Sequence, residues 1–273
     1  MQTLDELIKH VKRYYAEGTW EGFVKSRPPI VNANPEKLAK EFVEEGLSRR
    51  TRLFREYIES TFNRFVLPKI SDAYDARILS MPCANGEEAF TLAIIALEAG
   101  LRYFKIDGRD ISEEHINQAL RGETWLQKRR IEQLADYIEK GYFTSTNAKF
   151  PYPNFFVDQS VKNKCEFYVH DILSDEILGG YEVTYCLNLL IHLSETGRDI
   201  ALWNLTKNMR QGDLLILDEP YEIPAAFDGR MYGQVYEQFG WKKAFNDFLA
   251  NLEAKEDLKL RKIGEDNVYE KMV

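Results

Sequence analysis

The stretch "SMPCANGEEAF", residues 80–90, decides the fold that we expect, because it joins a strand to a helix. The run "RILSMP" is apolar and short, as in a buried strand, and residues 86–99 favour a helix that ends at Gly100. In a doubly wound sheet, such a loop is where a nucleotide meets the protein. It holds one glycine followed by two glutamates, so the G-x-G-x-x-G pattern of dinucleotide sites is absent and a dehydrogenase is disfavoured.

Strand and helix signals alternate from this loop to the end of the chain. "YFKIDG" predicts a second strand, and Ser112 with two following glutamates suits a helix start. Three more apolar runs, "CEFYVHD", "EVTYCLNLLI" and "DLLILDE", alternate with helix candidates at 124–139, 195–210 and 231–253, and "DNVYEKM" reads as a closing strand. This alternation predicts an α/β fold, a mostly parallel Rossmann-like sheet with helices on both faces.

The region before the sheet carries only helical signals. "RLFREYIESTFNRFVLPKI" places Phe54, Ile58, Phe62 and Phe65 on one face of a helix. We therefore expect a small all-helical N-terminal domain over residues 1–72 and a Rossmann-like domain over 73–273. Residues 225–255 read as helical and aromatic, and they either cover the active site or pack on the sheet.

Composition excludes several classes of function. The net charge of −8 disfavours nucleic acid as a partner, since phosphate binding needs a basic face. The three cysteines are far apart and lack metal-ligand spacing, so we expect free thiols and no metal site. No apolar segment approaches the roughly 18 residues of a membrane span, and the first residues lack the pattern of a secretory signal. We expect a cytoplasmic protein with no membrane insertion.

The two glutamates of the loop point to a cationic ligand. Glu87 and Glu88 would repel a pyrophosphate but attract ammonium and sulfonium groups, and S-adenosylmethionine is a nucleoside that carries both and no phosphate. Asp110, at the end of the second predicted strand, is placed to accept both ribose hydroxyls. In the alternative interpretation, the glutamates only complement the helix dipole and Asp110 caps the next helix.

Five segments together resemble the chemotaxis-receptor methyltransferase (CheR-type) family. "TRLFR" (51–55) is similar to its T-x-F-F-R element, and "PCANGEEAFTLA" (82–93) to its C-S-S-G-E-E-P-Y-S-L-A loop. "GRDIS" (108–112) resembles A-T-D-I-S, "HDIL" (170–173) stands at the family's aspartate- or asparagine-leucine pair, and "CLNLLIHL" (186–193) resembles C-R-N-V-L-I-Y-F. The resemblance runs from about residue 47 to the end, in matching order.

The resemblance implies an S-adenosylmethionine-dependent methyltransferase that forms S-adenosylhomocysteine as it methylates carboxyl oxygens of protein glutamates. Glu87 or Glu88 would hold the methionine ammonium, Asp110 the ribose, and Asp171 or Ile172 would lie near the adenine. Arg55 would steer an anionic carboxylate substrate. The residues that we expect to bind the cofactor are Pro82, Ala84, Glu87, Glu88, Asp110, Ile111, Asp171, Ile172, Asn188 and Leu189, and the expected catalytic residues are Arg55 and His192.

Two departures from the family lie on the acceptor side. Leu187 replaces an arginine, and His192 replaces a tyrosine. His192 is either a general base or orienting group, or a chemically idle histidine that closes a strand. A carboxylate acceptor would not need that base, whereas a hydroxyl or amine would benefit from it. Arg49, Arg50 and Arg52 form either a solvated helix face or a positive rim for acidic partners.

Two alternatives to glutamate methylation stay open. In the first, a CheR-like methyltransferase acts on a small molecule or on another protein group through His192. In the second, the protein is a noncatalytic module that binds S-adenosylmethionine or S-adenosylhomocysteine and signals through a partner. The expected partner is a protein or small-molecule methyl acceptor with a carboxylate, and a role in chemotaxis is the family's own.

Overall fold

The computed structural model describes most of the chain and divides it into two compact units. One unit joins Met1–Leu47, Asp171–Gly180 and Thr184–Val273, and the other joins Ser48–His170 and Tyr181–Val183. We call them the first and the second unit. The division into a helical domain over residues 1–72 and a Rossmann-like domain over 73–273 stays a prediction. The described residues are 4–17, 19–20, 23, 35–43, 53–126, 128–146, 155–177, 179–218 and 241–273.

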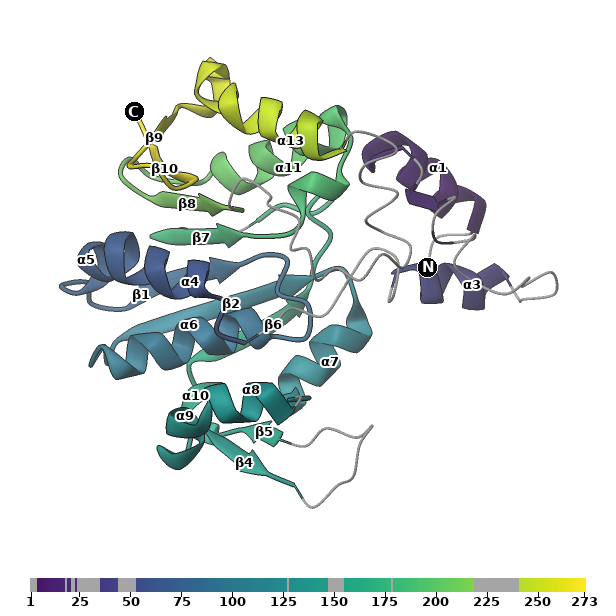
Figure 1. Ribbon diagram of the computed structural model, residues 1–273. Helices are drawn as coiled ribbons and strands as arrows, with labels where there is room; N and C mark the ends of the chain where they lie inside the picture. Colours follow the sequence, from purple (N-terminus) through teal and green to yellow (C-terminus); the bar gives the residue numbers. More distant parts are fainter. Residues whose placement is uncertain are drawn as a thin grey trace. The chain divides into compact units, whose positions relative to one another are not determined.

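Within the described residues, seven strands form one sheet in the order β6-β2-β1-β7-β8-β10-β9 (Figure 1). Strand β1 pairs in parallel with β2, and β2 with β6, whereas β10 pairs antiparallel with β8 and β9. The predicted α/β fold is thus confirmed. The strands are β1 Ala76–Ser80, β2 Phe104–Asp110, β6 Cys165–Val169, β7 Val183–Cys186, β8 Leu214–Leu217, β9 Leu260–Lys262 and β10 Val268–Lys271.

In the second unit, two helices cover one face of the sheet. Helix α6, Glu87–Glu98, is buried on nearly every side, and α7, Glu113–Arg121, also contacts β2 and β6. Phe90 of α6 packs edge-on against Phe167 of β6. Both helices were predicted, because Gly86 and Ser112 mark their starts in the sequence. Ser112 caps α7, its hydroxyl accepting a hydrogen bond from the backbone N–H of His115.

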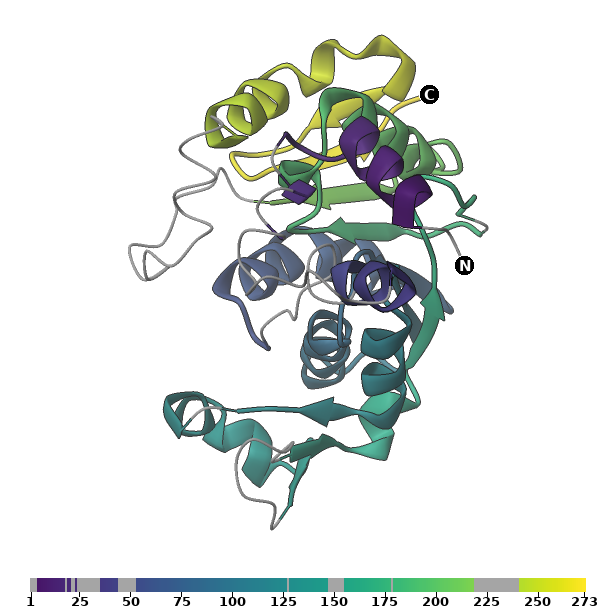
Figure 2. The same cartoon turned by 90° about the vertical axis from the view of Figure 1, so that its right-hand side faces the viewer.

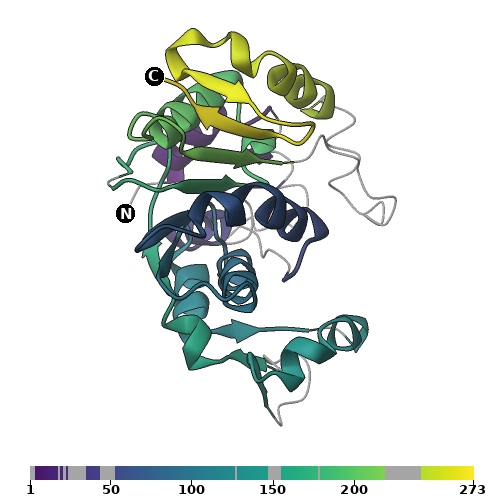
Figure 3. The same cartoon turned by 90° about the vertical axis from the view of Figure 1, so that its left-hand side faces the viewer.

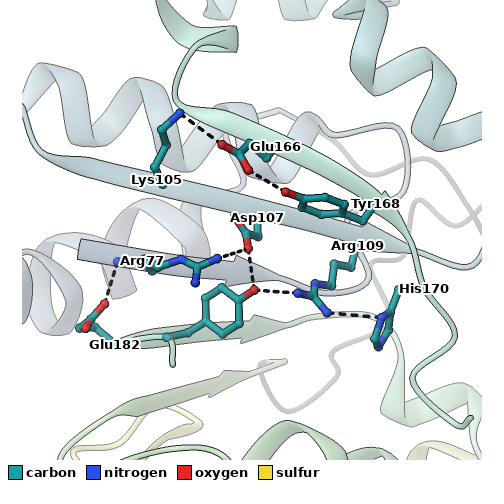
Figure 4. Close-up of polar contacts among 9 residues, drawn as sticks. Arg77, Lys105, Asp107, Arg109, Glu166, Tyr168, His170 and Glu182 are labelled. Atoms are coloured by element: carbon teal, nitrogen blue, oxygen red, sulfur yellow. Dashed lines mark hydrogen bonds and ion pairs between the residues drawn. The ribbon is translucent and has the colours of Figure 1, made fainter. Parts of the chain in front are cut away.

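The opposite face of these strands carries a charged network (Figure 4). The Asp107 carboxylate accepts hydrogen bonds of 2.6 Å from both Arg77 and the Tyr181 hydroxyl, and Arg109 donates to Tyr181 at 2.9 Å. Asp107 is buried, so the two donors stabilise its charge. Burial and the bond to Asp107 raise the pKa of Tyr181 to about 12. The network therefore pairs Asp107 and Arg109, which β2 directs to this face, with Arg77 and Tyr181.

The helix predicted before the sheet is present but uneven. It consists of α4 Glu56–Thr61, the π-helix η2 Phe62–Val66 and α5 Leu67–Ile70. Ile58 and Phe62 are fully buried, as the apolar stripe predicted. Phe54 precedes the helix with φ 49°, its N–H donates to Thr91 of α6, and its ring stacks on Tyr137.

A small antiparallel sheet in the second unit was not predicted. Its order is β3-β5-β4, with β3 Glu123–Thr124, β4 Phe143–Ser145 and β5 Phe155–Val157. The helix expected over 124–139 is divided into α8 Lys128–Gln133 and α9 Ala135–Glu139, and its first residue lies in β3. Helix α10, Gln159–Lys162, leads on to β6.

The first unit contains both ends of the described chain. Helix α1, Leu4–Tyr14, contacts α11, Glu195–Thr206, as the purple and green ribbons of Figure 2 show. After β8 come α13 Trp241–Ala250, the short 3-10 turns η4 Leu252–Ala254 and η5 Glu256–Leu258, and the hairpin of β9 and β10, drawn in yellow in Figure 3. Helix α3 covers Pro35–Glu41.

The start of the chain is hydrogen-bonded to the turn that carries His192. The Ala16 N–H donates to the His192 carbonyl at 2.8 Å, and the Ser194 N–H donates to the Tyr14 carbonyl at 2.9 Å. Tyr15 and Leu193 form an antiparallel bridge between these two bonds. Residues 14–16 therefore pack against the turn that carries His192 in the first unit.

Several predictions fall outside the described residues. These are the arginines at 49, 50 and 52 and the first part of the aromatic segment expected over 225–255. The three cysteines are described, and all are buried and free of disulfides. Within the described ranges, no helix is long and apolar enough to cross a membrane.

Candidate functional site

The conformation of the loop from β1 to α6 requires its single glycine. Gly86 is the N-cap of α6 with φ 83°, and a Cβ atom there would lie 2.8 Å from the Ala119 side chain. A left-handed backbone against a neighbouring helix admits glycine at least cost. The Cys83 N–H donates to the Arg109 carbonyl at 2.8 Å, which holds the loop to the end of β2.

Glu87 and Glu88 begin α6, where carboxylates complement the helix dipole. The Thr124 hydroxyl donates to Glu87 Oε1 at 2.7 Å, and the Ser80 hydroxyl donates to Glu88 Oε1 at 2.8 Å. Both carboxylates are buried. The two hydroxyl donors therefore orient both carboxylates at the start of the helix.

Asp110 braces two loops at the end of β2. Its Oδ2 accepts the Ala84 N–H at 2.8 Å, and its Oδ1 accepts the Ser112 N–H at 2.9 Å. Ala84 is held in a left-handed conformation with φ 46°. Asp110 is buried, Ile111 and Pro82 are half-buried, and all three lie at the carboxyl ends of β1 and β2 as predicted. Asp110 thus fixes the shape of the expected cofactor loop, whatever else it binds.

Two uncharged groups complete this loop. Burial, together with the Asp110 and Glu88 carboxylates, raises the pKa of the Cys83 thiol well above its usual value, so the thiol is neutral. Asn85 is fully buried, and neither its Oδ1 nor its Nδ2 has a hydrogen-bond partner in the part of the chain that the structure describes. A buried amide in that state is uncommon and calls for a polar ligand or another explanation.

In the first unit, Asp171 and Ile172 form a tight turn after β6. Asp171 Oδ1 accepts the Leu173 N–H at 2.9 Å, and its other oxygen accepts the Ser174 hydroxyl. The Ile172 carbonyl accepts a hydrogen bond from Asn204 of α11. The turn is therefore anchored to α11, which orders the segment predicted to lie near the adenine.

Asn188, Leu189 and His192 follow β7 in the same unit. Asn188 has φ 60°, and its N–H donates to Asp218 Oδ2 at 2.6 Å. Leu189 is buried, and the half-buried His192 ends the 3-10 turn η3, Leu190–His192. The strand predicted over this run stops at Cys186, so His192 does not close a strand. Leu187 is fully buried, a core position in which a charged arginine would need a partner.

A buried arginine secures the His192 turn. Arg198 of α11 donates to the Leu190 carbonyl at 2.9 Å and to the Ala244 carbonyl of α13 at 3.3 Å. Its guanidinium lies over the Phe245 and Phe248 rings, and burial lowers its pKa. Arg198 thereby ties α13 to the turn.

Arg55 is the N-cap of α4 in the second unit. Its carbonyl accepts the Ile58 N–H at 3.0 Å, and its side chain is half-buried. The neighbouring Phe54 is bonded to α6, so the arginine is attached next to the helix that bears Glu87 and Glu88.

Each unit supplies part of the predicted set. The second unit holds Arg55, Pro82, Ala84, Glu87, Glu88, Asp110 and Ile111, and the first holds Asp171, Ile172, Asn188, Leu189 and His192. Ser80, Asn85, Thr124 and Asp218 also contribute to these segments but were not predicted. A polar residue at the end of an apolar strand was the available signal for Ser80 and Asp218. The described side chains contain no cluster of three His, Cys, Asp or Glu suited to a metal ion.

Comparison with known proteins identifies the family of this chain. Residues 49–227, more than half of the chain, match the family described as CheR methyltransferase, SAM binding domain. The chain belongs to the CheR methyltransferase family. The resemblance seen in the sequence is confirmed, and so is S-adenosylmethionine as the ligand of the matched domain. Which residues bind it remains a prediction.

Relatives of this CheR-family chain are distant. A chemotaxis protein methyltransferase of Listeria monocytogenes is 26% identical over 154 residues, 54% of either protein. The probable biofilm formation methyltransferase WspC of Pseudomonas aeruginosa is 28% identical over 131 residues, 46% of this chain and 29% of that protein. A solved structure, the N-methyltransferase NodS of Bradyrhizobium japonicum, is 12% identical with a TM-score of 0.46, covering 94% of this chain and 100% of that one. The chain spans about half the length of the first curated relatives it matches.

Proposed function

We propose that this protein transfers a methyl group from S-adenosylmethionine to the side-chain carboxylate of a protein glutamate. The observation that carries the proposal is the pair of buried carboxylates, Glu87 and Glu88, at the start of α6 in a CheR-family chain. Chemotaxis methyltransferases among its relatives favour a protein acceptor.

The chemistry of the loop suits this cofactor. Two carboxylates favour an ammonium or sulfonium and oppose a phosphate, and the Asn85 amide offers a buried donor and acceptor to a polar ligand. We assign the ammonium to Glu87 or Glu88 and the ribose to Asp110. Asp171 and Ile172 would lie near the adenine, and Pro82, Ala84, Ile111, Asn188 and Leu189 would line the remaining surface.

The acceptor side is proposed to work by alignment. When bound, S-adenosylmethionine supplies a methyl group whose bond to a positively charged sulfur breaks as a carboxylate oxygen bonds the carbon, with the electron pair leaving on sulfur. Arg55 would hold the acceptor carboxylate by its charge. A carboxylate has no proton to lose, so no base is needed, and positioning with exclusion of water supplies most of the rate.

Calorimetric titration of S-adenosylhomocysteine tests the cofactor site. Glu87→Gln and Glu88→Gln preserve shape and one acceptor oxygen but remove the charge, so one of them should weaken affinity about tenfold or more. Glu98→Gln, at the other end of α6, is the matched control and should bind like the wild type. Unchanged affinity in both loop variants would refute the assignment.

The acceptor class is tested by the stability of the product. A labelled methyl donor incubated with acidic protein fractions should give labelled protein whose label is released as methanol in mild base, because methyl esters hydrolyse and N-methyl groups do not. Base-stable label would instead favour another protein group.

His192 favours a second candidate, a CheR-like methyltransferase with a small-molecule, hydroxyl or amine acceptor. That chemistry releases a proton, which an imidazole is suited to take near neutral pH. The noncatalytic binding module is the remaining alternative, and binding of the cofactor without methylation of any acceptor class would support it. The cytoplasmic location predicted from sequence remains a prediction.

A further inference from the structure

Among the described residues, two other than glycine adopt the left-handed conformation in the predicted cofactor segments that follow β1 and β7. Ala84, after β1, has φ 46°, and Asn188, after β7, has φ 60°. Such conformations cost free energy and persist where the surroundings hold them. They mark places where the surrounding structure constrains the backbone.

In both places an aspartate holds the strained backbone. The Ala84 N–H donates to Asp110 at 2.8 Å, and the Asn188 N–H donates to Asp218 at 2.6 Å. Asp110 is the last residue of β2, the strand beside β1, and Asp218 directly follows β8, the strand beside β7. The same device therefore occurs twice, once in each unit.

Asp218 is itself held rigidly. Its side chain is 1% exposed, and its carbonyl accepts a hydrogen bond of 2.5 Å from the buried side-chain amide of Asn267. The Leu217 N–H donates to the Asn267 carbonyl at 2.9 Å. Because Asn267 directly precedes β10, the sheet holds the backbone from which the Asp218 carboxylate projects.

We infer that Asp218 is a positioning residue of the cofactor site, acting through the backbone of Asn188. The inference rests on the proposed function, in which Asn188 and Leu189 line the cofactor. The carboxylate satisfies the Asn188 N–H with a charge-assisted hydrogen bond and so keeps the turn in its left-handed form. Without it, Asn188 would relax toward ordinary backbone angles and carry Leu189 with it.

A merely structural role for Asp218 makes a different prediction. If the buried carboxylate only supports the fold of the first unit, its loss should cost stability without a specific loss of affinity. Asp213 offers the matched control, since it is also buried, lies at the opposite end of β8 and accepts hydrogen bonds from Arg210.

Asn188→Gly separates the two roles further. Glycine adopts positive φ without strain, so a glycine turn no longer needs the aspartate to hold it. Removing Asp218 should therefore cost little additional affinity in the Asn188→Gly background. The two positions form a double-mutant cycle whose coupling measures the positioning effect.

The experiment is titration of S-adenosylhomocysteine into the wild type, Asp218→Ala, Asp213→Ala, Asn188→Gly and the Asn188→Gly/Asp218→Ala pair, each first checked by thermal unfolding. We expect Asp218→Ala to bind about tenfold or more weakly, Asp213→Ala to bind within about twofold of wild type, and the pair to bind like Asn188→Gly alone.

The inference would be overturned if Asp218→Ala bound S-adenosylhomocysteine as tightly as the wild type. It would also be overturned if Asp218→Ala lost the same affinity in the wild-type and in the Asn188→Gly background. In either case, binding by the wild type would still support the cofactor site. Absence of binding to the wild type would overturn the proposed function and the inference together. If Asp218→Ala does not fold, Asp218→Asn replaces it. We expect Asp218→Asn to lower the affinity for S-adenosylhomocysteine several-fold in the wild-type background and to leave it unchanged in the Asn188→Gly background.

Discussion

A Cβ atom on Gly197 would lie 2.0 Å from the backbone carbonyl oxygen of Tyr14. The same carbonyl accepts the Ser194 N–H, so the first residues and α11 approach each other backbone to backbone. Only glycine at position 197 permits that close approach, which lies next to the turn that carries His192.

Gly197→Ala should lower the free energy of unfolding by about 1–3 kcal/mol, the usual cost of overpacking, because the clash is with backbone. Urea denaturation measures the change, and faster proteolysis within α1 should accompany it. Gly180→Ala is the control, since a Cβ there meets only Arg210 side-chain atoms at 3.6 Å or more. Equal stability of the two variants would contradict the packing described.

Stability should fall at high pH through Tyr181. Its pKa is raised from 10.0 to about 12 in the folded protein, so the folded state keeps a proton that the unfolded state loses near pH 10. This contribution is present in full below about pH 10 and is lost as the pH rises through about 12. After allowance for solvent screening it amounts to about 1–2 kcal/mol.

Tyr181→Phe isolates this effect from the other tyrosines. The difference in unfolding free energy between wild type and Tyr181→Phe should shrink between pH 9 and about 11.5, as urea titrations at each pH would show. A difference that stays constant with pH would mean that Tyr181 ionises at its ordinary pKa.

Thr124→Val should weaken the binding of S-adenosylhomocysteine about three- to tenfold, because it removes the hydroxyl that orients Glu87. Thr144→Val, at an exposed position in the same small sheet, should leave the affinity unchanged. Calorimetry measures the affinity of both variants. Equal affinities would show that β3 does not support the cofactor site.

His192→Gln distinguishes the acceptor classes by rate. With a carboxylate acceptor, turnover should stay within about threefold of the wild type, because no proton leaves. With a hydroxyl or amine acceptor it should fall about 10²- to 10⁴-fold, the usual worth of a general base. Unchanged affinity for S-adenosylhomocysteine would show that the cofactor site is intact in the variant.

Local signals predicted the elements that local chemistry determines. Helices α6 and α7 follow from Gly86, Ser112 and apolar spacing, and β8 follows from the uninterrupted apolar run Leu214–Leu217. The small sheet was missed because β3 has only two residues and pairs with β5, about 30 positions later. Pairing over that separation leaves no periodic pattern in the sequence.

In the candidate site, too, local features could be predicted and long-range contacts could not. From spacing and resemblance, Glu87 and Glu88 could be placed at the start of a helix and Asp110 at the end of a strand, whereas the residues that support them could not be predicted. Thr124 bonds Glu87 across 37 positions, and Asp218 bonds Asn188 across 30. These partners depend on how the chain folds back, which a single sequence does not encode in any local pattern.

The contact between the first residues and the His192 turn sets an order of events during synthesis. The Ser194 hydroxyl donates to the Arg13 carbonyl 181 positions earlier, and a ribosome adding about 5–20 residues per second needs about 10–40 seconds to cover that distance. During this interval the apolar face of α1, with Leu7 and Val11, has not yet met α11. Helix α1 is thus synthesised well before the His192 turn, whose backbone forms hydrogen bonds with the residues at the end of this helix.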